Sequence, residues 1–161
     1  MTIRDRNLHP NAGSRVNSVV VTITSAQILA LNATPITIVP APGAGLTNIF
    51  EGAVIQKPAG TAYTIGTNVG FAVKYTNGAG LDVGAIVAVA GFIDQATTQT
   101  RFIRARSAAM TAGTESGLNP VENAVLVLQA LTAAPTAGTS PFVLKVYFRT
   151  VPMVPDTGVN G

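Results

Sequence analysis

The segment PFVLKVYFRT, residues 141–150, decides the fold class, because apolar and polar side chains alternate along most of its length. One set of residues is apolar and would face a core together: Phe142, Leu144, Val146 and Phe148. The set between them would face outward: Lys145, Tyr147 and Arg149. A period of two residues is typical of a β-strand with one buried face. The segment therefore predicts a half-buried strand.

Similar segments, rich in β-branched or alternating apolar residues, recur along the chain and predict further strands. The full set of predicted strands is 15–24, 34–39, 48–57, 69–75, 85–90, 98–106, 121–128 and 141–150. In the fourth of these, Val69, Phe71, Val73 and Tyr75 are predicted to share one face. AIVAVA, at 85–90, has apolar residues at every position, which predicts a central strand buried on both faces.

The segments between these strands carry turn and cap signals. PAPGAG, residues 40–45, predicts a loop, because proline and glycine cannot continue a central ladder. Asn77 and Gly78 form a pair that tolerates the positive φ of a tight hairpin turn. A single helical turn is predicted over residues 26–31, with the Ser25 hydroxyl as its cap.

Eight or so short strands separated by Gly/Pro/Thr loops predict an all-β fold, a two-sheet β-sandwich that is jelly-roll-like. Strand order does not follow from these patterns, so a barrel stays open as the alternative. Residues 1–14 mix charge, Asn, Pro and Gly without periodicity, which predicts an extended N-terminal arm. Residues 15–151 are predicted to form the sandwich domain, and residues 152–161 a C-terminal tail.

Composition suggests that part of the surface is covered by other subunits. Hydrophobic residues make up 47% of the chain and charged residues only 11%, against about 25% charged in an average soluble domain. A monomer usually keeps a charged exterior without apolar patches. We therefore expect an obligate oligomer. The chain has no cysteine, so disulfides and thiolate metal sites are excluded.

Two classes of partner are not expected. The net charge is +3 and the ten basic residues include no Lys/Arg-rich run, so nucleic acid is not predicted as a partner. No apolar run approaches the roughly 18 residues of a membrane span, and no signal segment is apparent at the N-terminus. A membrane is therefore not predicted as a partner either.

The residues that could carry chemistry are few, and we predict that the chain is not an enzyme. His9 is the only histidine, so no catalytic, cofactor or metal site is predicted. Glu51 and Asp94 are a formal carboxylate pair for glycoside hydrolysis, but solvation or salt bridges explain them more simply. The glycine groups at 43–45 and 78–80 are not followed by the helix that a phosphate site requires, and are interpreted as turns.

The densest basic cluster consists of Arg101, Arg104 and Arg106, with Phe102 between them. On a strand, Arg104 and Arg106 would share a face with Phe102. The cluster is interpreted either as a subunit contact or as a strand edge protected by charge. The full set of candidate subunit or capsid contacts is Arg4, Arg6, His9, Arg15, Arg101, Arg104 and Arg106.

Several separated segments resemble, in order, small virion structural proteins of tailed bacteriophages. They are SAQILALNATPITIVPAPGAG at 25–45, EGAVIQKPAGTAY at 51–63, VKYTNGAG at 73–80, GFIDQATTQTRF at 91–102 and SPFVLKVYFRT at 140–150. Residues 4–15 depart from the pattern. The family has no catalytic motif to transfer, so no site residues are carried over from it.

This resemblance implies a virion structural protein, of the capsid cement or decoration type. Such a protein would bind the major capsid protein, stabilise contacts between capsid subunits and associate with itself, commonly as a homotrimer. It would be made in the host cytoplasm and would be located on the capsid surface of the virion. The alternative is a tail-fibre or receptor-binding β-module, and a small hydrolase is the third class. Sugar recognition would require exposed aromatic residues in loops, and the chain has no tryptophan.

Overall fold

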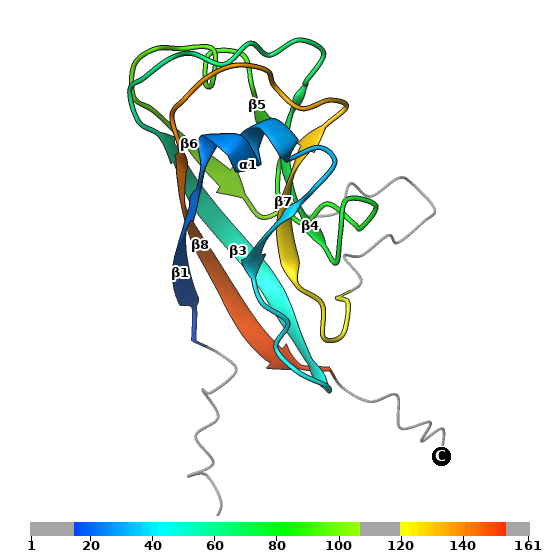
Figure 1. Ribbon diagram of the computed structural model, residues 1–161. Coiled ribbons are helices and arrows are strands. Elements are labelled where there is room, and N and C mark those ends of the chain that lie inside the picture. Colours follow the sequence, from blue (N-terminus) through cyan, green and yellow to red (C-terminus); the bar gives the residue numbers. More distant parts are fainter. Residues whose placement is uncertain (1–14, 107–119, 154–161) are drawn as a thin grey trace, which may run out of the picture.

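The computed structural model describes residues 15–106 and 120–153. Within these residues the chain forms eight strands and one short helix (Figure 1). The strands are β1 (Asn17–Ile23), β2 (Ile36–Val39), β3 (Leu46–Lys57), β4 (Gly70–Tyr75), β5 (Val87–Ala88), β6 (Gln99–Arg104), β7 (Leu126–Leu131) and β8 (Phe142–Pro152). The helix α1 spans Ser25–Ala30. No helix within the described ranges has the length and apolar character needed to cross a membrane.

The strands form two antiparallel sheets of four strands each. Sheet A has the order β1-β8-β3-β6 and sheet B the order β2-β7-β4-β5. The first strand therefore pairs with the eighth, the second with the seventh, the third with the sixth and the fourth with the fifth. This is the pairing of one long hairpin rolled into two layers, which is the jelly roll. The predicted all-β two-sheet sandwich is confirmed.

The core lies between the inward faces of the two sheets. Phe142 on β8 is fully buried, and its ring centroid lies 5.3 Å from that of Phe71 and 5.7 Å from that of Phe92. Leu144 and Val146 are also fully buried, and Phe148 packs against the core at its margin. The alternation that predicted the inward face of β8 is confirmed.

The prediction of a central strand over residues 85–90 is wrong. Only Val87 and Ala88 form a strand, and β5 is an edge of sheet B. The reason is that this segment crosses between the sheets: Gly84 bridges Ala105 beside sheet A, whereas Val87 pairs with Phe71 of sheet B. A crossing segment can pair with each sheet only briefly.

The strand predicted over residues 121–128 begins instead at Leu126. Asn123 has a positive φ of 50°, which a strand does not accommodate. Its backbone N–H donates to the Leu46 carbonyl, and its side-chain oxygen accepts from the Gly43 N–H. The residues before β7 therefore form a turn that is bound to the loop between β2 and β3.

The cap of α1 is Thr24 rather than the predicted Ser25. The Thr24 hydroxyl accepts a hydrogen bond of 3.3 Å from the Gln27 N–H, and Gln27 Oε1 accepts one of 2.9 Å from the Thr24 N–H. These two bonds form a capping box, which needs a Gln or Glu three residues after the cap. Gln27 has that spacing from Thr24 and not from Ser25.

Two details of the β4 region also differ from prediction. Val69 precedes the strand and is 57% exposed, whereas the other three members of its predicted face are buried. In the following turn the positive φ falls on Thr76 (66°), and neither Asn77 nor Gly78 adopts one. Asn77 instead uses its side-chain oxygen to accept a hydrogen bond from the Ala79 N–H.

Candidate protein-docking surface

The outer face of sheet A carries a row of four neighbouring side chains that crosses all four strands, and three of the four are apolar. The strand register places Val20 of β1 beside Lys145 of β8, Lys145 beside Val54 of β3, and Val54 beside Phe102 of β6. We call Val20, Val54 and Phe102 the apolar row; Lys145 lies within it, between Val20 and Val54. Phe102 is 76% exposed and Val20 60% exposed. A large aromatic side chain is therefore left in solvent at one end of the row.

A β-bulge interrupts β3 next to this row. Phe50 pairs with Phe148 and Gly52 with Tyr147, so Glu51 is an extra residue with no partner on β8. Gly52 has a φ of +153°, and a Cβ atom there would lie 3.1 Å from the Ile103 carbonyl oxygen. Glycine is therefore favoured at this position, and its missing side chain leaves a gap in the sheet surface.

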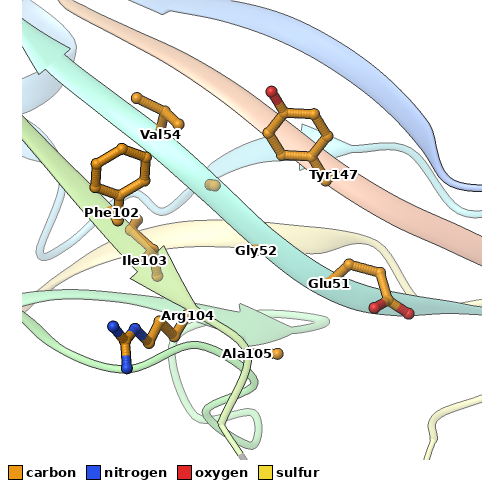
Figure 2. A pocket seen from close by; sticks show the side chains of 9 residues that line it. Glu51, Gly52, Val54, Phe102, Ile103, Arg104, Ala105 and Tyr147 are labelled. Atoms are coloured by element: carbon orange, nitrogen blue, oxygen red, sulfur yellow. The ribbon is translucent and has the colours of Figure 1, made fainter.

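This gap opens into a shallow depression of about 450 Å³, which we call the bulge hollow (Figure 2). Gly52 lies between Tyr147 of β8 and Arg104 of β6 in the strand register. Figure 2 shows Phe102 next to Val54 on one side of the hollow, with Tyr147 on the other side of β3. The lining residues are Glu51, Gly52, Ala53, Val54, Phe102, Ile103, Arg104, Ala105 and Tyr147.

Charged side chains lie next to the apolar residues of this face. Glu51 Oε1 accepts a hydrogen bond of 2.6 Å from Arg149 Nε in a partly exposed ion pair. Lys145 Nζ lies 5.4 Å from the centroid of the Tyr147 ring, a distance that permits a cation–π contact. Lys145 and Arg104 are not within 4.0 Å of a carboxylate among residues 15–106 and 120–153. The face therefore combines exposed apolar groups with two cations that lack an ion-pair partner in the described chain.

The three clustered arginines have different environments. Arg101 lies with its guanidinium 5.4 Å from the centroid of the Phe92 ring and donates to the carbonyl oxygens of Gly91 and Thr100. Arg106 forms an ion pair of 3.0 Å with Asp82. Arg104 is exposed and lines the bulge hollow. Of the cluster, Arg104 is therefore the member that lines the bulge hollow together with Phe102.

Of the other candidate contacts, the structure describes only Arg15. Arg15 is exposed and precedes β1 by two residues. Arg4, Arg6 and His9 lie outside the described residues. The contact role of all seven candidates stays a prediction.

Lys57, at the end of β3, is a buried charged residue that sequence reasoning missed. Its side chain is fully inaccessible, and Nζ donates hydrogen bonds of 2.7 Å to the Gln95 carbonyl and 3.2 Å to the Pro58 carbonyl. Burial lowers the pKa of this amine, because desolvation disfavours the charged form. The alternation of Ala53, Ile55 and Lys57 was the available signal, since it places all three on one face. The bond to Gln95 connects β3 to the loop before β6, whereas the bond to Pro58 stays within the segment that follows β3. Both satisfy the buried amine, which is a structural role.

Glu51 and Asp94 do not form a carboxylate pair. Glu51 is bound to Arg149, whereas Asp94 lies next to Gln95, the residue whose carbonyl binds Lys57. Glu51 and Lys57 are six residue steps apart along the strand, about 20 Å at the usual rise. The pKa of Asp94 is lowered mainly by a hydrogen bond from the Gln95 side chain, and to a smaller extent by one from the Gly91 amide. Both bonds favour the ionised carboxylate.

The described residues contain no group of three or more His, Asp or Glu that could hold a metal ion. The glycine groups predicted as turns are turns. The Gly43 and Gly45 N–H groups donate to the side chains of Asn123 and Glu122. Gly80 closes the second turn by donating to the Asn77 carbonyl.

The chain was compared with protein-family models, curated proteins and solved structures, and none of the three comparisons gave a match.

Proposed function

We propose that the chain is a bacteriophage virion structural protein, a capsid cement or decoration protein that docks on the major capsid protein through the outer face of sheet A. The observation that carries this proposal is Phe102, 76% exposed beside Val54 at the bulge hollow. An apolar patch bordered by polar residues is characteristic of protein–protein contact surfaces. Aromatic and arginine side chains are the residues that dominate binding energy in such surfaces. Phe102, Tyr147 and Arg104 line this hollow together.

Three further observations support the assembly role. The chain has 11% charged residues, which suits a surface that is covered after assembly. Its fold is the jelly roll, an architecture that viral capsid proteins use along with lectins and cupins. The head location itself rests on the resemblance of five segments to virion proteins of tailed phages, because a fold alone does not assign a function.

The mechanism in this proposal is passive. A rigid sandwich would bridge neighbouring capsid subunits, and each contact would add to the others because many copies bind one shell. Lys145 and Arg104 would bind carboxylates of the capsid surface, and Phe102 and Val54 would exclude water from the centre of the contact. Further copies of the chain complete the assembly, in the homotrimer that the resemblance implies.

The location is tested by labelling intact virions with an antibody against the chain and imaging them by electron microscopy. Label distributed over the head supports a cement protein. Label at the tail tip supports the receptor-binding alternative and contradicts the head location. Virions without label contradict both.

The docking face is tested by mixing the full chain with heads that lack it and sedimenting the particles. Phe102→Asp should weaken head binding at least tenfold, because loss of an aromatic contact that dominates binding typically costs about 2 kcal/mol or more, and the new carboxylate adds a charge to the contact. Leu81→Asp is the matched control, since Leu81 is also an exposed apolar residue (54%) but follows the turn after β4 of sheet B. Equal binding by both variants would place the contact elsewhere.

A further inference from the structure

The four edge strands of the two sheets differ in how well they are protected from pairing with another chain. The backbone of β6 is partly occupied, because Ala85 donates to the Arg104 carbonyl and Arg106 donates to the Val83 carbonyl. On sheet B, β2 has four residues and an irregular register after Thr37, and β5 has only two residues. Short strands, irregular register and covering segments are the usual means of protecting a sheet edge.

The remaining edge strand, β1, has none of these protections in the described chain. It pairs on one side with β8 in an unbroken register of seven residues. Its sequence, NSVVVTI, contains no charged residue, proline or glycine. Figure 1 shows β1 at the outer margin of sheet A. An edge strand directs alternate N–H and C=O groups away from its sheet. β1 therefore offers a regular and uncharged template for a further strand.

The side chains of β1 are also incompletely covered. Val19 and Val21 point toward the core, yet each is only partly buried. Val20, on the outer face, is 60% exposed, and Val16, just before the strand, is 56% exposed. A strand added to this edge would cover the inward-facing valines and extend the apolar row of the outer face.

We propose that β1 is a self-association site, where β1 of a second copy adds antiparallel about a two-fold axis that lies between the two strands, midway between the Val20 residues of the two copies. Val20 is the midpoint of Asn17–Ile23, so this register pairs all seven residues. It places Val20 beside the partner subunit's Val20, and Ser18 beside the partner subunit's Thr22. Pairs of β-branched residues and pairs of hydroxyl residues are favourable across strands. The absence of charge avoids like charges in direct opposition, which would disfavour self-pairing.

The pairing is isologous, because the same strand contributes to both sides of the contact. It joins sheet A of two copies into one sheet of eight strands. This inference does not rest on the capsid proposal, since it follows from the strand edges alone. A homotrimer would have to be held by other surfaces, because the pairing joins copies only in twos.

The experiment uses the absence of cysteine, which makes any introduced thiol unique. Val20→Cys places two thiols in direct opposition in the proposed register, so mild oxidation of the full chain should convert most of it to a disulfide-linked dimer. Thr100→Cys is the matched control, because Thr100 is exposed on β6, at the opposite margin of the same sheet. Cross-linking of Val20→Cys no faster than that of Thr100→Cys overturns the proposal.

The second measurement is the mass of the full wild-type chain in solution as a function of concentration. We expect dimers, and we expect Val20→Lys to raise the dimer dissociation constant at least about tenfold by opposing two cations. A wild-type chain that stays monomeric overturns the proposal and favours a strand from a different protein as the occupant of this edge. An assembly whose mass and stability Val20→Lys leaves unchanged also overturns it. Failure of either measurement leaves the head-binding test unaffected, because that test uses Phe102.

Discussion

The outer faces of the two sheets differ in how completely the chain covers them. On sheet B, Ala72 and Val127 lie outside the central core cluster, yet they are 0% and 3% exposed. On sheet A, Phe102 and Val20 are 76% and 60% exposed at outward positions. Both sheets belong to one jelly roll, so the difference comes from what lies over them.

Local segments fold over sheet B. Gln129 of β7 donates from Nε2 to the Asn32 carbonyl at 3.2 Å, and its side chain lies against Gly78. Lys74 of β4 donates to the Gly78 carbonyl at 2.9 Å and forms an ion pair with Asp82. The turns after α1 and β4 therefore cover this face from within the chain. Sheet A has no such cover among the described residues, and Phe102 and Val20 stay exposed on its outer face.

The largest expected effect is a difference in stability between a substitution on the inner face of sheet A and one on its outer face. Phe142→Ala should lower the free energy of unfolding by about 3 to 5 kcal/mol, because it removes a fully buried ring that contacts three other aromatic rings. Phe102→Ala, on the outer face, should change it by about 0.5 kcal/mol or less. Urea unfolding of both variants measures the two values. Similar losses would mean that Phe102 contributes to folding and not only to docking.

A second prediction uses pH to test whether water is excluded from the space between the two sheets. Burial raises the pKa of Tyr63 to about 12 from the ordinary 10, and its hydroxyl donates to the Ser140 carbonyl at 2.5 Å. The unfolded chain would lose this proton near pH 10 and the folded chain near pH 12. The contribution to stability is therefore present below pH 10 and is lost as pH rises to 12, about 2 to 3 kcal/mol in all.

The check for Tyr63 is urea unfolding of wild type and Tyr63→Phe between pH 8 and 12. The variant should lose less of its free energy of unfolding above pH 10 than wild type does. The loss that remains in the variant includes the contribution of Tyr75, because burial also raises the pKa of that residue. Parallel curves for the two proteins over the whole range would show that Tyr63 is in contact with water.

A third prediction compares glutamines at outward positions of the two sheets. Gln129→Ala should cost about 1 kcal/mol, because it removes a hydrogen bond and opens the cover of sheet B. Gln56→Ala should cost about 0.5 kcal/mol or less, since Gln56 is exposed and its bond to Thr100 is 3.3 Å long. Thermal unfolding of both variants decides the order. If Gln56→Ala cost more, sheet A rather than sheet B would depend on its outer side chains.

The smallest expected effect concerns the ion pair at the bulge. Glu51→Gln should cost about 0.2 to 1 kcal/mol, because the pair with Arg149 is partly exposed and salt screens it. Raising the salt concentration should reduce the difference from wild type. A loss of several kcal/mol that does not depend on salt would mean that Glu51 fixes the bulge itself.

The sequence predicted the fold class and the inward face of β8, because alternation reports the burial of each strand directly. The pattern could not distinguish a central strand from a segment that crosses between the two sheets. Residues 85–90 show this, because a run with apolar residues at every position is compatible with both structures. The pattern also missed the start of β7, because the positive φ of Asn123 depends on bonds to Leu46 and Gly43, which are distant in sequence.

The candidate site was predictable only in part. The proximity of Phe102 and Arg104 in sequence indicated their shared face, and both line the bulge hollow. The apolar row could not be predicted, because it requires the order β1-β8-β3-β6 and the registers of three strand pairs. The hollow depends on the bulge at Glu51, and bulges have no sequence pattern that the alternation of β3 would reveal.

The position of β8 between β1 and β3 determines when the chain can fold during synthesis. Sheet A requires β8 to join β1 to β3, and β8 is the last strand in the described chain. A ribosome that has released β1 to β7 has therefore produced only one strand pair of this sheet, β3 with β6. Most pairings in the molecule join distant segments, which slows folding. We expect the nascent chain to keep its apolar strands exposed until Phe142–Pro152 emerges, so chaperones have their longest access at that stage.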